Sequence, residues 1–454
     1  MSVNLGTRQE LDAFFAAHPD AQAVQIMITD PSGVLRGKSV RCEELPRIFD
    51  TGRQVAGSIL GLDITGQDVD ETGLVWDTGD ADMTARPIAG TLVRAPWLAA
   101  PNGQLLLTMF DGQGAPAPAD PRHALVRAAD RLRRAGFTPV VACELEFYLL
   151  KEEAGGRLAT AGGGRPGERQ KIDSYSLQRL DDLAPVFDDV YRSAIAQGLP
   201  AGTLMSEYSP GQFEITLHHR DDVMRAVDEA VMFKRLLRGV AQKHGLIACF
   251  MAKPFSGRAG SGLHVHVSLN DSRGANVFAS EDPAGTPALR HAIGGMRATM
   301  AESMAIFAPN ANSYRRFVNE SYAPVAPIWG INNRTVSLRV PSGPPASRHV
   351  EHRIAGADAN LYLAVATVLA GVSHGIEQGI DPGPPVEGNG YAQVRERTLP
   401  RTWRESLDIA ARSAFLRDAL GPEFLKIFLA IKEQECARFS AEVSELDYAW
   451  YLRS

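Results

Sequence analysis

The 454-residue chain contains little cysteine and no long hydrophobic run. Its four cysteines, Cys42, Cys143, Cys249 and Cys436, are far apart, and no two of them form a CxxC pair. A disulfide framework and a zinc knuckle are therefore not expected, and we expect reduced, mostly buried thiols. The longest apolar stretch, LYLAVATVLAG from Leu361, is too short to cross a bilayer and is typical of a buried helix.

An excess of basic residues is also missing. The formal net charge is −6 and the isoelectric point is about 6.0, so neither a nucleic acid nor an anionic membrane would be attracted to the protein. The segment 1–15 has no basic region followed by an apolar stretch, and we expect no secretory signal peptide. These absences favour a cytoplasmic protein that acts on small soluble molecules.

The chain is longer than a single domain usually grows, and its pattern changes near residue 120. Residues 20–110 contain short apolar stretches separated by Gly, Pro and Asp turns, which predicts a small sheet-rich domain. Asp120 and Pro121 then provide an N-cap and a first-turn proline for a helix that stops at Gly136. Farther on, strand patterns alternate with long helical ones, and the stretch 152–170 is typical of a surface loop. Two domains, 20–115 and 120–454, are therefore predicted.

Pairs of glutamates occur on predicted strands. In PVVACELEFYLL, Glu144 and Glu146 share one face of a strand whose surroundings are apolar on both faces. Two carboxylates in a central strand would repel each other unless a cation lay between them. A solvated strand face is the alternative for this pair taken alone.

A second pair, Glu207 and Glu214, flanks the Pro-Gly turn of SEYSPGQFEITL. A hairpin there would bring both carboxylates to one place, and two unrelated surface acids are the alternative. In GSGLHVHVSL, strand alternation places His264, His266 and Ser268 on one face.

Arginines accompany a fifth acid nearer the C-terminus. NNRTVSLRVP contains Arg334 and Arg339, and RHVEHR contains Glu351 and Arg353. Carboxylates together with a histidine are ligands for Mg²⁺ or Mn²⁺. Arginines beside such metals suit phosphoryl transfer, because charge develops on the phosphate oxygens. The sequence has neither a P-loop nor a kinase-type glycine loop.

Six motifs in order make the chain resemble glutamine synthetases from about residue 20 onward. They are ACELEFYLL, EYSPGQFEITL, MAKPFSGRAGSGLHVHVSL, NSYRRF, NNRTVSLRVP and EHRIAGADANLYLAVATVLAG. The resemblance implies an α+β fold, with a small β-grasp-like N-terminal domain and a catalytic domain in which antiparallel strands form an incomplete barrel surrounded by helices. It also implies a homo-oligomer of six-membered rings, usually stacked in pairs, with each active site between neighbouring subunits.

The same resemblance implies ATP and two or more Mg²⁺ or Mn²⁺ ions as cofactors, and a role for each motif residue. One metal would be bound by Glu146, Glu207 and Glu214, and the other by Glu144, His264 and Glu351. His266 and Ser268 would contact ATP, Gly260, Arg316 and Arg353 would hold glutamate, and Arg334 and Arg339 would bind and stabilise the phosphates during transfer.

The sequence departs from the family at the ammonium site. Family members have a flap glutamate after the NSY(K/R)R motif, where this chain has Tyr322, and Glu320 two residues earlier is an alternative acid. The family's DGSS-like loop corresponds to VAGSILGLD, in which Ser58 is present and no acid occurs before Asp63. Ala259 replaces the family's usual asparagine.

The loss of both acids weakens a site for cationic ammonium and leaves room for a substituent on nitrogen. This pattern resembles the γ-glutamylpolyamine and γ-glutamylamine synthetase branch, which often serves amine catabolism. We therefore predict an ATP-dependent ligase that joins the γ-carboxyl of glutamate to a primary polyamine or monoamine through a γ-glutamyl phosphate, with Tyr322 and Ser58 at the amine. The alternatives are an ammonia-dependent glutamine synthetase, an enzyme that activates another carboxylate, and a non-catalytic ATP- and metal-binding or structural homologue. The sequence leaves open which amine is used, and whether one ring or two form.

Overall fold

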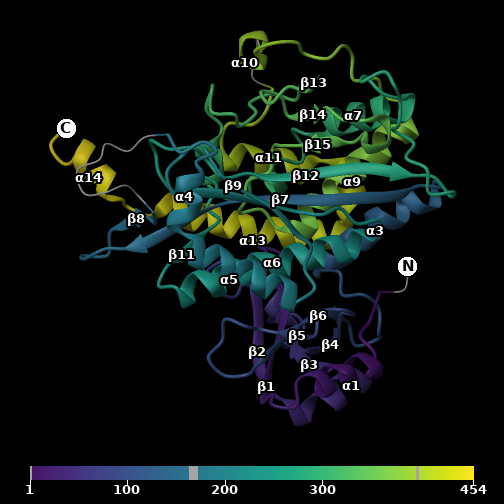
Figure 1. Ribbon diagram of the computed structural model, residues 1–454, viewed down its shortest axis with the longest axis vertical. Helices are drawn as coiled ribbons and strands as arrows, with labels where there is room; N and C mark the ends of the chain where they lie inside the picture. Colours follow the sequence, from purple (N-terminus) through teal and green to yellow (C-terminus); the bar gives the residue numbers. More distant parts are fainter. Residues whose placement is uncertain (1–2, 163–171, 395–397) are drawn as a thin grey trace.

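The computed structural model describes residues 3–162, 172–394 and 398–454. Figure 1 shows a small sheet at one end of the molecule and a large sheet toward the other, with helices between them. Of the predicted surface loop 152–170, residues 163–170 lie outside the described residues. The part before them contains a short strand, β8 (Leu158–Thr160), which pairs with the end of β7 (Thr138–Glu152).

The small sheet is formed by the N-terminal part of the chain. Its strand order is β2-β1-β6-β4-β3, and β5 also pairs with β6. Strands β1 and β2 form an antiparallel hairpin, whereas β1 and β6 are parallel. The bounds are β1 (Ala23–Thr29), β2 (Leu35–Arg41), β3 (Arg53–Ala56), β4 (Asp82–Pro87), β5 (Val93–Arg94) and β6 (Gly103–Phe110).

The large sheet has the order β13-β14-β15-β12-β7-β10-β9, with β8 and β11 pairing with β7. Its pairs are antiparallel except β13 with β14. The bounds are β9 (Ala201–Ser206), β10 (Gln212–Leu217), β11 (Ile247–Cys249), β12 (Leu263–Asn270), β13 (Trp329–Ile331), β14 (Leu338–Val340) and β15 (Val350–His352). The sheet curls into a half barrel surrounded by helices, and this confirms the predicted α+β fold class.

Strand β7 is the longest strand of the sheet and has two different faces. Cys143, Leu145 and Phe147 are buried in the main hydrophobic core, whereas Glu144 and Glu146 project from the opposite face. Helices α3 (Pro121–Arg134) and α6 (Val223–Lys243) pack against β7, and α9 (Leu361–Gln378) packs against α3 and α7 (Pro287–Thr299). The helices therefore cover one face of the strand and leave the glutamate face free for chemistry.

Helix α3 begins and ends at the residues that the sequence predicts. The Asp120 side chain accepts a hydrogen bond from the Arg122 backbone N–H, Pro121 is the first residue of α3, and Gly136 has a positive φ just after the helix. The LYLAVATVLAG stretch lies in α9, which is buried along most of its length. Among the described residues, no helix combines the length and apolar character that crossing a bilayer requires.

The C-terminal part of the chain contributes to the core of the small sheet. Ile427 and Ile431 of α13 (Pro422–Ala441) are buried in one cluster with Leu60, Val69 and residues of β1 and β6. Helix α13 therefore joins the small sheet to the rest of the molecule by apolar packing.

A buried ion pair connects three helices below the large sheet. The Nε and Nη2 atoms of Arg122 donate to the two carboxylate oxygens of Asp228 at 2.9 and 2.8 Å. The Tyr362 hydroxyl donates to the same carboxylate at 2.7 Å. This network links α3, α6 and α9.

We expect Asp228→Asn to destabilise the fold, because it leaves the buried Arg122 guanidinium without a counter-charge. The cost should be about 3 kcal/mol, seen as a lower midpoint of thermal unfolding. Asp188→Asn on the exposed side of α5 (Ala184–Ala196) is the matched control and should leave the midpoint unchanged. Equal midpoints for the two variants would contradict the assignment.

Candidate active site

Four adjacent strands, β15, β12, β7 and β10, present acids and histidines on one face of the large sheet. Residues directly opposite each other in an antiparallel pair project from the same face. The opposed pairs are Glu214 with Glu146, His264 with Glu144, and His266 with Glu351. Side chains from distant parts of the chain are therefore gathered by strand pairing alone.

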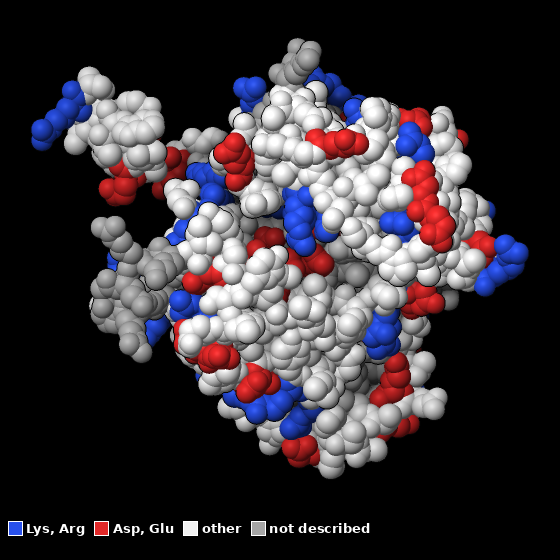
Figure 2. All heavy atoms as spheres, turned by 45° about the horizontal axis from the view of Figure 1, so that its top comes forward, with Lys and Arg blue, Asp and Glu red and all other residues white. Residues whose placement is uncertain are grey.

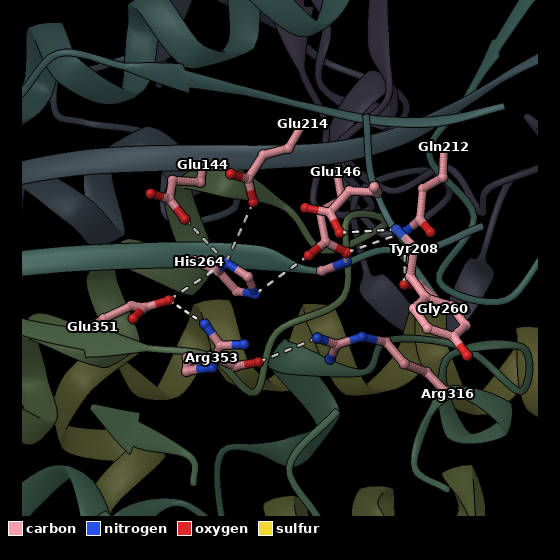
Figure 3. Close-up of polar contacts among 12 residues, drawn as sticks. Glu144, Glu146, Tyr208, Gln212, Glu214, Gly260, His264, Arg316, Glu351 and Arg353 are labelled. Atoms are coloured by element: carbon pink, nitrogen blue, oxygen red, sulfur yellow. Dashed lines mark hydrogen bonds and ion pairs between the residues drawn. The ribbon is translucent and has the colours of Figure 1, made fainter. Parts of the chain in front are cut away.

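His264 lies at the centre of this cluster (Figure 3). Its Nδ1 atom is 3.1 Å from Glu144 Oε2, 3.6 Å from Glu351 Oε1 and 3.8 Å from Glu214 Oε2, and its Nε2 atom is 3.7 Å from Glu146 Oε1. Ligand atoms of Glu144, His264 and Glu351 lie within 4.8 Å of one another, as do those of Glu146, Glu214 and His264. Carboxylate oxygens with one imidazole fit Mg²⁺ or Mn²⁺, so the donor set suits divalent cations.

Crowding of the carboxylates changes their pKa values. Burial and repulsion from four other glutamates raise the pKa of Glu214 well above its ordinary value. Burial and the charge of Glu146 raise the pKa of Glu207 to about 7. Burial also opposes ionisation of Glu144, but hydrogen bonds with His264 and His266 outweigh it and hold the pKa of Glu144 below its usual range. The cluster around Glu214 therefore has an excess of negative charge that a cation would relieve.

Arginines supply positive charge at the other end of the cluster. Arg339 Nη1 donates to Glu351 Oε2 at 2.9 Å, and Arg353 donates to Glu351 Oε1. Burial opposes ionisation of Glu351, but Arg353 and His264 lower its pKa to about 2. The Nε atoms of Arg339 and Arg353 are buried and have no hydrogen-bond partner among the described residues. These donors are therefore free to bind an anionic ligand.

Arg316 and Gly260 lie together beside the carboxylates (Figure 3). Arg316 is buried, and its Nη1 and Nη2 atoms donate to the carbonyl oxygens of Ile354 at 2.9 Å and Arg353 at 3.3 Å. A Cβ atom at Gly260 would lie 2.7 Å from Arg316 Cγ and 2.6 Å from a backbone oxygen. Only glycine fits this close approach, which places the backbone of residue 260 against the arginine.

A cavity of about 1130 Å³ adjoins the acid cluster and is lined by Glu144, His266, Ser268 and His349, among others. His349 Nδ1 donates to the Ser347 carbonyl oxygen at 2.7 Å, and its Nε2 lies 3.0 Å from His266 Nδ1. His266 Nε2 lies 3.0 Å from Glu144 Oε1. The wall of the cavity is thus joined to the acid cluster through His266. Figure 2 shows acidic side chains deep in the central hollow of one face, with basic side chains beside them.

Other predicted site residues lie farther from this cluster. Glu207, just after β9, belongs to neither metal-binding group, although its charge interacts with Glu146 and with the exposed Arg334. Tyr322 is 57% exposed in the loop after Arg316 and has a positive φ, as has Glu320. Ser58 lies in the 3₁₀ helix η2 (Gly57–Leu60) beyond β3 of the small sheet, where its backbone N–H donates to Asp80.

Sequence reasoning missed two residues that the structure adds to the site. His349 alternates with Glu351 in RHVEHR, so a period of two places both on one strand face. Gln212 precedes Glu214 by two residues on β10 in the same way, and its Nε2 donates to the Gly260 carbonyl oxygen at 3.0 Å. In both motifs the period of two indicates these residues, since each lies two positions from a glutamate that was predicted as a metal ligand.

Comparison with known proteins gives concordant matches. Residues 118–451 match the family model described as glutamine synthetase, catalytic domain. The chain is 40% identical to gamma-glutamylputrescine synthetase PuuA of Escherichia coli K12, over 98% of this chain and 95% of the relative. It is 31% identical to glutamate–isopropylamine ligase of a Pseudomonas species, over 96% of each chain. A solved structure of GmaS in complex with ADP superposes with a TM-score of 0.85 at 26% identity, covering 98% of this chain and 99% of the other.

We expect Mn²⁺ to raise the unfolding temperature by an increment that grows between about pH 5 and pH 8. A carboxyl whose pKa is raised by folding binds more protons in the folded than in the unfolded protein. Glu214 and Glu207 therefore lower the free energy of unfolding of the metal-free protein as the pH rises above 4.5, the ordinary pKa of a glutamate carboxyl. The deprotonated cluster is also the form that would bind a cation. Thermal unfolding with Mn²⁺ and with a chelator, over a pH series, measures the increment.

Glu214→Gln should have opposite effects on stability and on metal affinity. Glutamine requires neither a buried charge nor the uptake of a proton on folding, so the unfolding temperature of the metal-free protein at neutral pH should rise, while the affinity for Mn²⁺ falls at least about tenfold. Glu433→Gln on the exposed side of α13 is the control. A variant that is destabilised without metal and binds Mn²⁺ normally would show that the cluster is not a cation site.

Proposed function

Because the chain belongs to the glutamine synthetase family, we propose that it is an ATP-dependent ligase that joins the γ-carboxyl of glutamate to a primary organic amine through a γ-glutamyl phosphate. The observation that carries this proposal is the full-length similarity to ligases named for putrescine and isopropylamine. The replacement of the family's flap glutamate by Tyr322 supports the same conclusion. The protein is an enzyme of the ligase class, and we further propose that it acts in amine catabolism in the cytoplasm.

The acid cluster would hold two divalent cations, Mg²⁺ or Mn²⁺. Glu144, His264 and Glu351 form one set of ligands, and Glu146 and Glu214 belong to the other, which Glu207 would complete by a side-chain rotation. The cations would supply the charge that lets an anionic carboxylate meet an anionic triphosphate. The raised pKa of Glu214 supports this role, because it reports an uncompensated negative charge.

The cavity beside the cluster is the proposed ATP site. Its walls include His266 and Ser268, and the transferred phosphate would face the arginines. The buried, unpartnered Nε atoms of Arg339 and Arg353 support phosphate or carboxylate binding there. Arg334 is exposed at the turn between β13 and β14, from which its side chain would approach the triphosphate.

Glutamate would be held by Arg316, Arg353 and the backbone at Gly260. Arg316 uses one hydrogen on each Nη atom for a backbone carbonyl, and a guanidinium has five N–H donors, so three remain for the substrate. The side-chain carboxyl of glutamate would then face the cluster, and the acyl phosphate formed there would be attacked by the amine.

The amine site requires a second copy of the chain in this proposal. Glu144 and Glu146 project from the face of β7 that is opposite to its packing with α6, and the small sheet lies beyond the helices in Figure 1. Ser58 is therefore on the far side of its own chain and would line the site of a neighbour. Helix α14 (Glu445–Tyr451) projects from the body with Leu446, Tyr448 and Trp450 each more than half exposed. Such a surface favours burial against another copy, and the family resemblance implies rings of six or stacked pairs of rings.

The first test is phosphate release with ATP, glutamate and Mg²⁺ or Mn²⁺. We expect kcat/KM for putrescine, isopropylamine or ethanolamine to exceed that for ammonium by at least about tenfold, because an organic substituent adds binding energy that ammonium cannot. Preference for ammonium would support an ammonia-dependent glutamine synthetase. No turnover with any amine, together with retained ATP binding, would support the non-catalytic homologue.

Tyr322→Glu should shift the preference toward ammonium. A carboxylate at this position would bind the ammonium cation and accept its proton, so kcat/KM for ammonium should rise about tenfold while that for the organic amine falls. Glu320→Gln is the matched control, because it removes the other acid of the flap. If Glu320→Gln abolishes turnover with every amine and Tyr322→Glu changes nothing, Glu320 is the proton acceptor and our assignment is wrong.

A further inference from the structure

Asp63, the first acid after Ser58, is completely buried and engaged within its own loop. Its Oδ1 atom accepts hydrogen bonds from the Thr65 backbone N–H at 2.8 Å, the Thr65 hydroxyl at 2.7 Å and the Gln67 backbone N–H at 3.0 Å. Its Oδ2 atom accepts from Arg438 of α13. Because the side chain is fully buried and both oxygens accept hydrogen bonds from the loop or from α13, this carboxylate faces no amine and fixes the loop.

A second attachment holds the same loop to α13. Glu435 Oε1 accepts from the Ile64 backbone N–H at 2.8 Å and from the Ser32 hydroxyl at 3.3 Å. Lys432 Nζ donates to Glu435 Oε2 and to Ser32 Oγ, both at 2.9 Å. Lys432 is 1% exposed and Glu435 is 7% exposed. A buried ion pair with every partner in place is rigid, because any displacement would leave a charge unpaired.

The turn between β1 and β2 connects this network to the start of α9. Arg36 Nη2 donates to the Asp63 carbonyl oxygen at 2.7 Å, and Arg36 Nε donates to Asp30 Oδ2 at 2.9 Å. Asn360, the N-cap of α9, donates to the carbonyl oxygens of Asp30 at 3.0 Å and Pro31 at 3.2 Å. Asn360 follows Arg353 of the site by seven residues, so a short stretch of backbone links the site to this hydrogen-bonded turn.

The segment 57–69 has a fixed base and an exposed tip. Leu60 and Val69 at the base are buried with Ile427 and Ile431 of α13, whereas residues 64–68 are exposed. Ile64 at the tip is 50% exposed even though its backbone N–H is bound by Glu435. This is the construction of a loop that presents side chains at a defined position to something outside its own chain.

We propose that Arg438 and the Lys432–Glu435 pair are positioning residues that hold segment 57–69 in place as a wall of the amine pocket of a neighbouring copy. This inference rests on the proposed function, in which Ser58 lines that pocket. It assigns to a C-terminal helix, remote from the acid cluster, a part in amine selection. The residues touch no substrate and act only through the loop.

Arg438→Met tests the proposal, with Lys426→Met on the exposed side of the same helix as the matched control. The KM for putrescine should rise roughly 3- to 10-fold in Arg438→Met, with KM for ATP and glutamate within about twofold of wild type. Amide hydrogen exchange of segment 57–69 should be faster than in the control, and Arg438→Lys should restore much of the amine KM because it keeps the charge. Size-exclusion chromatography checks that the assembly is intact.

Asp63→Asn and the double variant Asp63→Asn/Arg438→Met complete a double-mutant cycle with Arg438→Met. Because both single changes break the same contact, the double variant should raise the amine KM no more than the larger single effect. An unchanged amine KM, an equal loss in every kinetic constant, or dissociation of the assembly in Arg438→Met would overturn the positioning role. If wild type used no organic amine, the proposed function would fail, whereas unchanged hydrogen exchange in segment 57–69 would refute the positioning role independently.

Discussion

Repulsion among five carboxylates on one sheet face is the constraint on which the catalytic part of this molecule depends. Glu214 is repelled by Glu144, Glu146, Glu207 and Glu351, and burial prevents water from screening these charges. Strand pairing holds the side chains together despite the repulsion, because Glu144, Glu146, Glu214 and Glu351 lie on paired strands and Glu207 directly follows β9. The free energy for this comes from the opposite face, where β7 is buried against α3 and α6. The sheet is thus stabilised on one face and charged on the other.

Positive charge is distributed unevenly over this face, so one end suits anionic groups and the other suits cations. Arg339 and Arg353 neutralise Glu351 and keep buried donors free, so this end suits anionic oxygens of substrate. The end around Glu214 keeps its excess negative charge and suits a cation. A phosphoryl group transferred between two anions needs both kinds of surroundings within a few ångströms.

The sequence was sufficient to predict which residues share a strand face, because the period of two is local. Glu144 with Glu146 and His264 with His266 follow from alternation within one strand, and the α3 boundary follows from Asp120 and Pro121. Strand order does not follow from local pattern, since β7, β10, β12 and β15 are joined by pairings between segments far apart in the chain. For that reason only the family resemblance, and not periodicity, predicted that the five acids lie in one site. His349 and Gln212 were not predicted, although each lies two residues from a predicted metal ligand. The burial of Asp63 was equally unpredictable, because its partner Arg438 is 375 residues away.

Contacts with the substituent of an organic amine can replace the acids that an ammonium site needs. Ammonium offers only its charge and four N–H donors, so a site for it depends on nearby carboxylates. A primary amine also carries an alkyl or aminoalkyl chain, and contacts with that chain position the nitrogen without an acid beside it. Such contacts act only if the surface that makes them has a fixed place relative to the acyl phosphate. In this chain that surface would come from a loop held to α13 by the Arg438–Asp63 ion pair and by the hydrogen bond from the Ile64 N–H to Glu435. Under this proposal, selectivity for the amine would depend on how firmly the loop of the small sheet is held, and the charged side chains of α13 would hold it.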